Sequence, residues 1–174
     1  MTSLGTLADK IAITTWKVGG GTYENIGTSV PKTAYQNEVG SSASSTTYGA
    51  KIGLMYVSDY YYSASPSAWT LVGSDSDATK DYRAATSTNW LYLVSYEWTI
   101  SREPGVANFA FAVRYDGNLG SFEVRSSYRV RPAFNLESSV NYVSGSGTIE
   151  NPIRINWLTD SFEKIPVKPG QNEV

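Results

Sequence analysis

The most regular pattern of hydrophobic and polar positions lies late in the chain, at residues 109–115. Large apolar residues occupy every second position there and alternate with Ala or Arg, and a period of two is typical of a strand with one face on the core. Asp116-Gly117 then supplies a turn pair that accepts positive φ angles, and residues 119–124 follow as a second strand. We therefore predict a β-hairpin. Residues 128–136 alternate again. The residues expected to be buried are Phe109, Phe111, Val113, Val130 and Phe134.

Other patterns predict shorter elements. Residues 51–57 form a continuous apolar run with turn signals at both ends, which is typical of a buried central strand. Residues 14–18 predict a strand preceded by a helical turn. Residues 75–85 carry acidic residues early and basic residues late, which favours a short helix. Residues 140–155 predict two short strands joined by a Ser/Gly loop at residues 144–147.

The length of the chain bounds its domain organisation. Its 174 residues, 41% of them hydrophobic, are enough for one domain with a real core, and we expect that domain over residues 1–157. Residues 158–174 contain Pro and Gly and are expected to form an exposed tail. No apolar run approaches about 18 residues, and the N-terminus lacks the features of a signal peptide. Either Met1 was added to an excised ectodomain, or the protein leaves the cell another way, for example in a virion.

Residue types and charge exclude several functions. The chain has no Cys and no His, which removes disulfides, the usual zinc sites, Ser-His triads and Cys nucleophiles. The net charge is −2. The basic residues are scattered apart from one group, Arg125, Arg129 and Arg131, which alternate with other residues as on a strand with one solvent-exposed face. Nucleic-acid binding is therefore not expected. Charged residues make up 17%, so Tyr, Ser, Thr and Gly cover much of the surface, either as half-buried strand faces or as a binding surface.

Acidic residues offer candidate chemistry, but a structural role is the better expectation for each. Asp75, Asp77 and Asp81 have the oxygen ligands that calcium prefers. Lys80 stands where a calcium loop needs Gly, so a solvated helix start is expected and no metal or cofactor. Glycoside cleavage would need a pair of carboxylates. Four further acidic residues could supply such a pair, but we expect them to be surface or turn residues: Glu97, Glu103, Asp116 and Glu123.

The aromatic residues and Arg131 lead to three further expectations. Trp90 and Trp98 lie among apolar neighbours and are expected to pack in the core rather than to stack on sugars. Tyr60, Tyr61 and Tyr62 are consecutive, so at least one of them points outward in an extended chain. Arg131 precedes a Pro on an inner strand and is expected to pair with a buried carboxylate or with loop carbonyls.

Three parts of the chain together resemble a known pattern. They read KIGLMYVSDY at residues 51–60, NWLY at 89–92 with EWTIS at 97–101, and VRPAFNL at 130–136 with SGSGT at 144–148. This combination resembles an uncharacterised domain family of Firmicutes surface and prepilin-like proteins. The order of Trp, Asp-Gly and Arg-Pro is also similar to the C-type-lectin-like fold, which includes formylglycine-generating-enzyme relatives and the variable proteins of diversity-generating retroelements. The resemblance covers most of residues 14–156.

The resemblance implies an α+β fold with small twisted antiparallel sheets, long loops and one or two short helices. It implies ligand recognition through the late hairpin and its flanking loops. It implies no enzymatic activity, because formylglycine-generating enzymes need Cys and this chain has none. Calcium-dependent sugar binding is not expected either, because Glu103-Pro104-Gly105 departs from the Glu-Pro-Asn of those lectins and their Trp-Asn-Asp is absent. The candidate ligand-binding residues are Tyr61, Arg102, Glu103, Asn108, Arg114, Tyr115, Asn118, Glu123 and Arg125.

Two functions remain open from the sequence. The first is a non-enzymatic recognition domain, extracellular, on a cell surface or on a virion, of bacterial or phage origin. Its partner would be a protein or glycan on another cell or particle, as in adhesion. The second is a structural subunit of a pilus-like or other surface fibre that associates with its own kind. An enzyme is not expected, because it would have to rely on carboxylate, Lys or Tyr chemistry.

Overall fold

The computed structural model describes residues 8–40, 46–148 and 150–157. The chain divides into two compact units, one of residues Ile13–Asn135 and one that combines Met1–Ala12 with Leu136–Val174. The single domain expected over residues 1–157 stays a prediction. The expected tail at residues 158–174 lies outside the described residues.

The larger unit contains short helices whose starts are fixed by local capping. The Thr22 side chain accepts a hydrogen bond from the Asn25 N–H at the start of the first helix, and Pro31 opens the second, where its missing N–H costs nothing. The Asp81 side chain accepts from the Ala84 N–H, so the helix expected at 75–85 begins only after that residue. The helices are α1 (Tyr23–Ile26), α2 (Pro31–Glu38), α3 (Val57–Tyr62), the 3-10 helix η2 (Pro66–Ala68) and α4 (Tyr82–Thr86).

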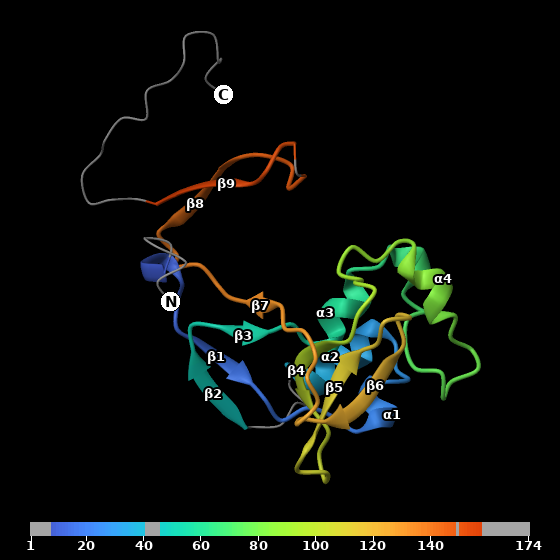
Figure 1. Cartoon of the computed structure of the whole chain (residues 1–174). Helices are drawn as coiled ribbons and strands as arrows, with labels where there is room; N and C mark the ends of the chain where they lie inside the picture. The colour runs from blue at the N-terminus through green and yellow to red at the C-terminus, as the bar shows by residue number, and fades with distance from the viewer. Residues whose placement is uncertain (1–7, 41–45, 149, 158–174) are drawn as a thin grey trace. The chain divides into compact units, whose positions relative to one another are not determined.

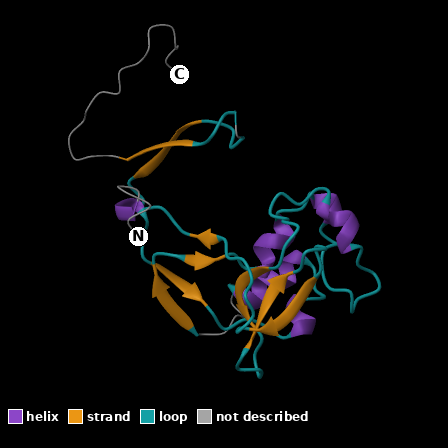
Figure 2. Ribbon diagram, viewed as in Figure 1, coloured by secondary structure: helices purple, strands orange, loops and turns teal. Residues whose placement is uncertain are grey.

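Three small antiparallel sheets accompany these helices in the larger unit. Strand β1 (Thr14–Lys17) pairs with β2 (Thr47–Ala50), and β3 (Gly53–Leu54) pairs with β7 (Pro132–Ala133). A three-stranded sheet has the order β4-β5-β6, and α1, α2 and α3 gather on one side of it (Figures 1 and 2). Its strands are β4 (Glu97–Arg102), β5 (Phe109–Val113) and β6 (Leu119–Glu123). The fold is thus mixed α and β with small antiparallel sheets, as expected.

The predicted late hairpin is confirmed. Strands β5 and β6 pair from Phe109↔Glu123 to Val113↔Leu119, and the turn between them places Gly117 at φ 86°. Phe111 and Val113 are buried, and Phe109 is half-buried. They lie in or beside a core formed with the helices, and its fully buried members include Ile26, Val57, Tyr60, Tyr61, Phe111 and Leu119.

The expectation that Val130 and Phe134 are buried is wrong. Both side chains are exposed. Their segment pairs with β3 only at Pro132 and Ala133, so most of the alternating run has no sheet to pack against. A period of two therefore identified an extended segment but not a buried face.

The buried central strand expected at residues 51–57 is reduced to the two half-buried residues of β3, Gly53–Leu54, because the chain turns into helix α3 at Val57. The Asp59 carboxylate accepts a hydrogen bond from the Tyr56 N–H at 2.8 Å. The buried Glu38 carboxylate accepts from the Val57 N–H at 2.9 Å and the Ser58 N–H at 2.8 Å. These acceptors satisfy the donors that a helix start leaves free, so the helix is more stable here than an extended chain.

The smaller unit is built on a hairpin, β8 (Val140–Ser144) with β9 (Arg154–Trp157). The loop predicted between two short strands is confirmed, with Gly145 at φ 102°. Ile11 forms an antiparallel bridge with Leu136, and the Glu137 N–H donates to the Lys10 carbonyl at 2.8 Å. These bonds hold residues 10–11 against residues 136–137.

Candidate functional site

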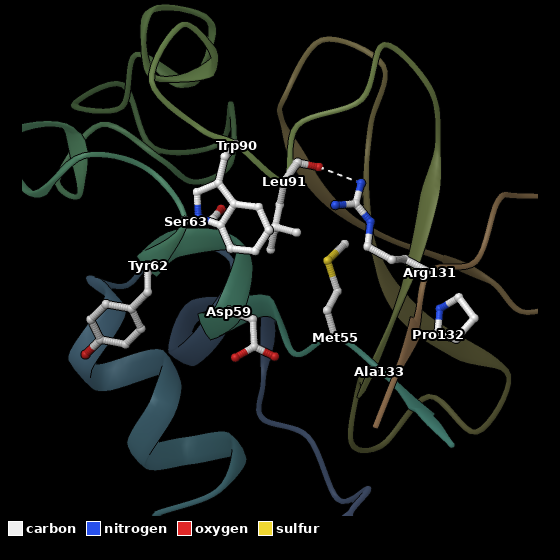
Figure 3. A pocket seen from close by; sticks show the side chains of 9 residues that line it. All are labelled: Met55, Asp59, Tyr62, Ser63, Trp90, Leu91, Arg131, Pro132 and Ala133. Atoms are coloured by element: carbon white, nitrogen blue, oxygen red, sulfur yellow. Dashed lines mark hydrogen bonds between the residues drawn. The ribbon is translucent and has the colours of Figure 1, made fainter. Parts of the chain in front are cut away.

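A pocket of about 420 Å³ opens in the larger unit, between α3, the segment that follows Asn89, and the segment at β7. Figure 3 shows the side chains around it. This volume is in the range of small-ligand pockets. The residues that line this first pocket are Met55, Asp59, Tyr62, Ser63, Trp90, Leu91, Arg131, Pro132 and Ala133.

A second pocket of about 480 Å³ adjoins the first, since both are lined by Asp59 and Ala133. The other lining residues of the second pocket are Thr14, Thr15, Trp16, Tyr35, Val39, Tyr56, Ser58, Phe134 and Asn135. We call the two pockets together the α3–β7 groove. None of the nine candidate residues from the sequence lines it.

Arg131 fixes one wall of the first pocket. Its Nε donates to Glu97 Oε1 at 2.9 Å, and its Nη2 donates to Glu97 Oε2 at 3.3 Å. The same Nη2 donates to the Leu91 carbonyl at 2.9 Å, the bond that Figure 3 shows as a dashed line. The expectation that this Arg pairs with a buried carboxylate or loop carbonyls is confirmed in both parts. Glu97 neutralises its charge, so Arg131 adds shape rather than free positive charge to the pocket.

Asp59 supplies the unneutralised charge of the groove. Its Oδ2 holds the Tyr56 N–H, while the residue remains exposed to solvent. Partial burial raises the pKa of this carboxyl group, and the Tyr56 N–H acts in the opposite direction. Among the lining residues of both pockets, only Asp59 and the neutralised Arg131 are ionised at neutral pH. The groove is therefore negative at the point where its two pockets meet.

Trp90 stands on the rim, and the expectation that it packs in the core is wrong. Its side chain is 76% exposed. The preceding Asn89 is buried instead: its Nδ2 donates to the Tyr60 carbonyl at 2.8 Å, and its Oδ1 accepts from the Ser63 hydroxyl and, at 3.0 Å, from the Leu91 N–H. These bonds fix the segment against α3 and direct Trp90 outward. The Asn-Trp pair was visible in the sequence, but which of the two faces the core was not.

The candidate Tyr61 points into the core, and its neighbour Tyr62 takes the outward position. Tyr61 is fully buried, and its hydroxyl donates to the Ile26 carbonyl at 2.9 Å. Tyr62 is 41% exposed and packs edge-on against Trp69 with 5.0 Å between the ring centroids. The three tyrosines lie on helix α3 rather than on an extended chain, so two consecutive residues share the core face.

The late-loop candidates do not form one site. Arg102, Glu103 and Asn108 lie at the end of the sheet where β4 joins β5, together with Glu123 and Arg125, since Phe109 pairs with Glu123. The other three lie at the opposite end, in the β5–β6 turn: Arg114, Tyr115 and Asn118. The four-residue length between the ends corresponds to about 13 Å of strand.

Several of these candidates are also bound within the protein. The candidate Asn118 is buried, and its Oδ1 accepts from the Asp75 N–H at 3.1 Å. Arg114 forms ion pairs with Asp75 at 3.7 Å and with Asp116 at 3.8 Å. Glu123 is half-buried and pairs with the exposed Arg125. Arg102, Asn108 and Tyr115 are exposed, as candidates for binding should be, and Glu103 is half-buried.

An aromatic cluster associated with the three-stranded sheet was missed from the sequence. Tyr96 and Tyr128 stack with 4.6 Å between their centroids, and Trp98 contacts Tyr128 at 4.8 Å. Phe122 meets both Tyr rings edge-on. The rings are half-buried by one another, so their main effect is to cover the sheet rather than to leave a hollow.

The acidic residues do not gather into a metal site. Within the described ranges, no group of three or more metal-ligating side chains occurs. Asp77 accepts from the Thr79 hydroxyl and N–H, and Asp81 caps α4. Asp81 therefore has the structural role of a helix cap.

Comparison of the chain with known proteins found no matching family model, no matching curated protein and no matching solved structure. In the described part of the chain, no helix combines the length and the apolar character needed to cross a membrane.

Proposed function

We propose that the chain is a non-enzymatic recognition domain with a C-type-lectin-like fold that binds a protein or glycan ligand outside the cell or on a virion. The ligand would bind in the α3–β7 groove. The proposal places the site away from the late loops, because the groove offers a concave surface whereas the loop candidates lie at two ends of a sheet.

One observation carries this proposal: Trp90 is 76% exposed at the edge of a pocket. Aromatic anchors beside a pocket are typical of the residues that dominate recognition. The hydrogen bonds of Asn89 hold Trp90 in this position without help from its own ring. The exposed ring is thus not needed to stabilise the segment, and a role in binding accounts for it.

The groove chemistry favours binding over catalysis. A catalytic pair of carboxylates needs two acids across a cleft. Among the described residues that line the two pockets, Asp59 is the only acid, and the buried Glu97 next to the first pocket's Arg131 is engaged by that guanidinium. Recognition needs neither a second acid nor a cofactor.

Arrays of proteins and glycans, read with the wild type and with Trp90→Ala, test the proposal. Tyr142→Ala is the matched control, because Tyr142 is 66% exposed on β8 of the smaller unit and lines neither pocket. We expect the wild type and Tyr142→Ala to bind the same ligand, and Trp90→Ala to lose at least tenfold in affinity. No ligand up to millimolar concentration, or equal binding by all three proteins, would overturn the proposal.

A further inference from the structure

We propose that the ligand of the α3–β7 groove is an extended peptide segment of a protein, with a Lys or Arg side chain against Asp59 and an apolar side chain in the pocket on each side. This inference rests on the proposed function and names the class of ligand. It follows from the arrangement, the charge and the polar groups of the groove.

The arrangement places one charge where two pockets meet, and each pocket has apolar side chains in its lining. Asp59 lines both pockets, and among the described lining residues only Ala133 does so as well. Met55, Leu91 and Trp90 give the first pocket a largely apolar wall, and the Asp59 carboxylate lies below Trp90 and Leu91 in Figure 3. Trp16, Val39 and Phe134 give the second pocket an apolar part, and Thr14, Thr15 and Asn135 give it a polar part. The groove thus presents an apolar surface and a mixed surface on the two sides of one acidic group.

The charge of the groove favours a cation. Arg131 is neutralised by Glu97 at 2.9 Å, and the Tyr56 hydroxyl is held by the backbone of Lys17, donating to its carbonyl at 2.9 Å and accepting from its N–H at 3.0 Å. The Asp59 carboxylate keeps acceptor capacity beyond the single N–H of Tyr56. A Lys or Arg side chain can use this capacity, whereas an acidic ligand would be repelled.

The polar groups of the first pocket argue for a peptide rather than a glycan. A sugar ring needs several free polar partners placed around it. The single proton of the Ser63 hydroxyl is donated within the protein, to the Tyr60 carbonyl or to Asn89 Oδ1. The Arg131 guanidinium donates to Glu97 and to the Leu91 carbonyl. An apolar side chain fills this pocket without needing these groups.

An extended peptide can direct three side chains at two pockets beside one charge. Side chains at positions i−2, i and i+2 of an extended chain lie on the same face, about 6.6 Å apart. A peptide of the pattern apolar-x-Lys-x-apolar therefore directs three side chains at the groove. The α3 wall is ordered in advance by the buried Glu38, which accepts from two N–H groups at its start, so binding does not have to order it.

The test uses the fluorescently labelled peptide Leu-Ser-Lys-Ser-Leu with blocked ends, measured by fluorescence polarisation at low salt. Two control peptides carry norleucine in place of Lys, or the order Ser-Leu-Lys-Leu-Ser. We expect the first peptide to bind at least tenfold more tightly than either control, a difference equivalent to about 1.4 kcal/mol. Its affinity should fall with added salt, and that of the norleucine peptide should not.

Variants of the full chain complete the test. Asp59→Asn keeps an oxygen for the Tyr56 N–H and should bind the Lys and norleucine peptides equally. Glu24→Gln removes an exposed carboxylate outside both pockets and should bind as the wild type does. Trp90→Ala should weaken both peptides alike.

Two results would overturn the inference: no preference for Lys over norleucine in the wild type, including no binding of either, or a preference that survives in Asp59→Asn. If an array ligand still requires Trp90 but not Asp59, the inference fails while the proposed function stands. If neither change alters binding of the array ligand, both fail.

Discussion

Arg131→Met removes the cation that neutralises Glu97 while keeping a side chain of similar length. The wild-type guanidinium makes two bonds to Glu97 and one to the Leu91 carbonyl. The Glu97 side chain is 3% exposed, so the variant leaves a carboxylate buried without its cation. The wall of the first pocket and the segment of Leu91 lose their shared anchor in the same step.

The magnitude follows from burial. Removing one partner of a fully buried ion pair costs about 3–5 kcal/mol. The Arg131 side chain is 30% exposed, so water can compensate part of the loss, and we expect about 2–4 kcal/mol. For a chain of this length that lowers the melting temperature by about 5–15 °C.

A double-mutant cycle with Glu97→Gln isolates the pair from general packing effects. The variants Arg131→Met, Glu97→Gln and their combination are compared by thermal and urea unfolding. The double variant should be more stable than the sum of the two single losses predicts, by about 1 kcal/mol or more. Additive losses, or an Arg131→Met variant that melts with the wild type, would refute this account of the anchor.

Two further predictions concern the core. Phe111→Ala should lower the free energy of unfolding by about 3–5 kcal/mol, because Phe111 is fully buried and stacks on Tyr23 with 5.9 Å between the ring centroids. Arg102→Ala should change the free energy of unfolding in urea by no more than about 0.5 kcal/mol. The reverse order would show that the strand faces are wrongly placed. Burial raises the pKa of Glu38 above its ordinary value of 4.5, so its contribution to stability is fully present below that value and is lost as the pH rises through the folded pKa. Glu38→Gln lacks this titration, so the wild type should lose stability relative to this variant above about pH 4.5. Melting curves of the two proteins from pH 4 to 8 would contradict this if the difference between their melting temperatures stayed constant.

The sequence was most informative where structure depends on neighbours along the chain. The Asp116-Gly117 turn and the period of two on either side are local signals, and both strands of the hairpin formed as predicted. Arg131 was placed correctly because an Arg among apolar residues needs a buried acceptor wherever it lies. Neither inference required knowledge of distant parts of the fold.

The burial of Tyr61 and the exposure of Trp90 were not predicted, for the opposite reason. Helix α3 begins at Val57 because of the Glu38 carboxylate, 19 residues earlier in the chain, and no local pattern reveals that contact. Once that segment is a helix, Tyr61 turns inward and Tyr62 outward. The exposure of Trp90 likewise depends on hydrogen bonds from Asn89 to α3, which an apolar neighbourhood in the sequence conceals.

The central claim, that the α3–β7 groove is the recognition surface, is tested most directly by the indole N–H signals in an NMR titration with the array ligand. Trp90 lines the first pocket, while Trp98 lies outside the groove and its indole N–H donates to the Ser126 carbonyl at 3.3 Å. The account predicts that the Trp90 signal shifts in proportion to bound ligand while the Trp98 signal stays in place. A stationary Trp90 signal, with shifts at Trp98 or at the backbone of Arg102 and Asn108, would contradict it.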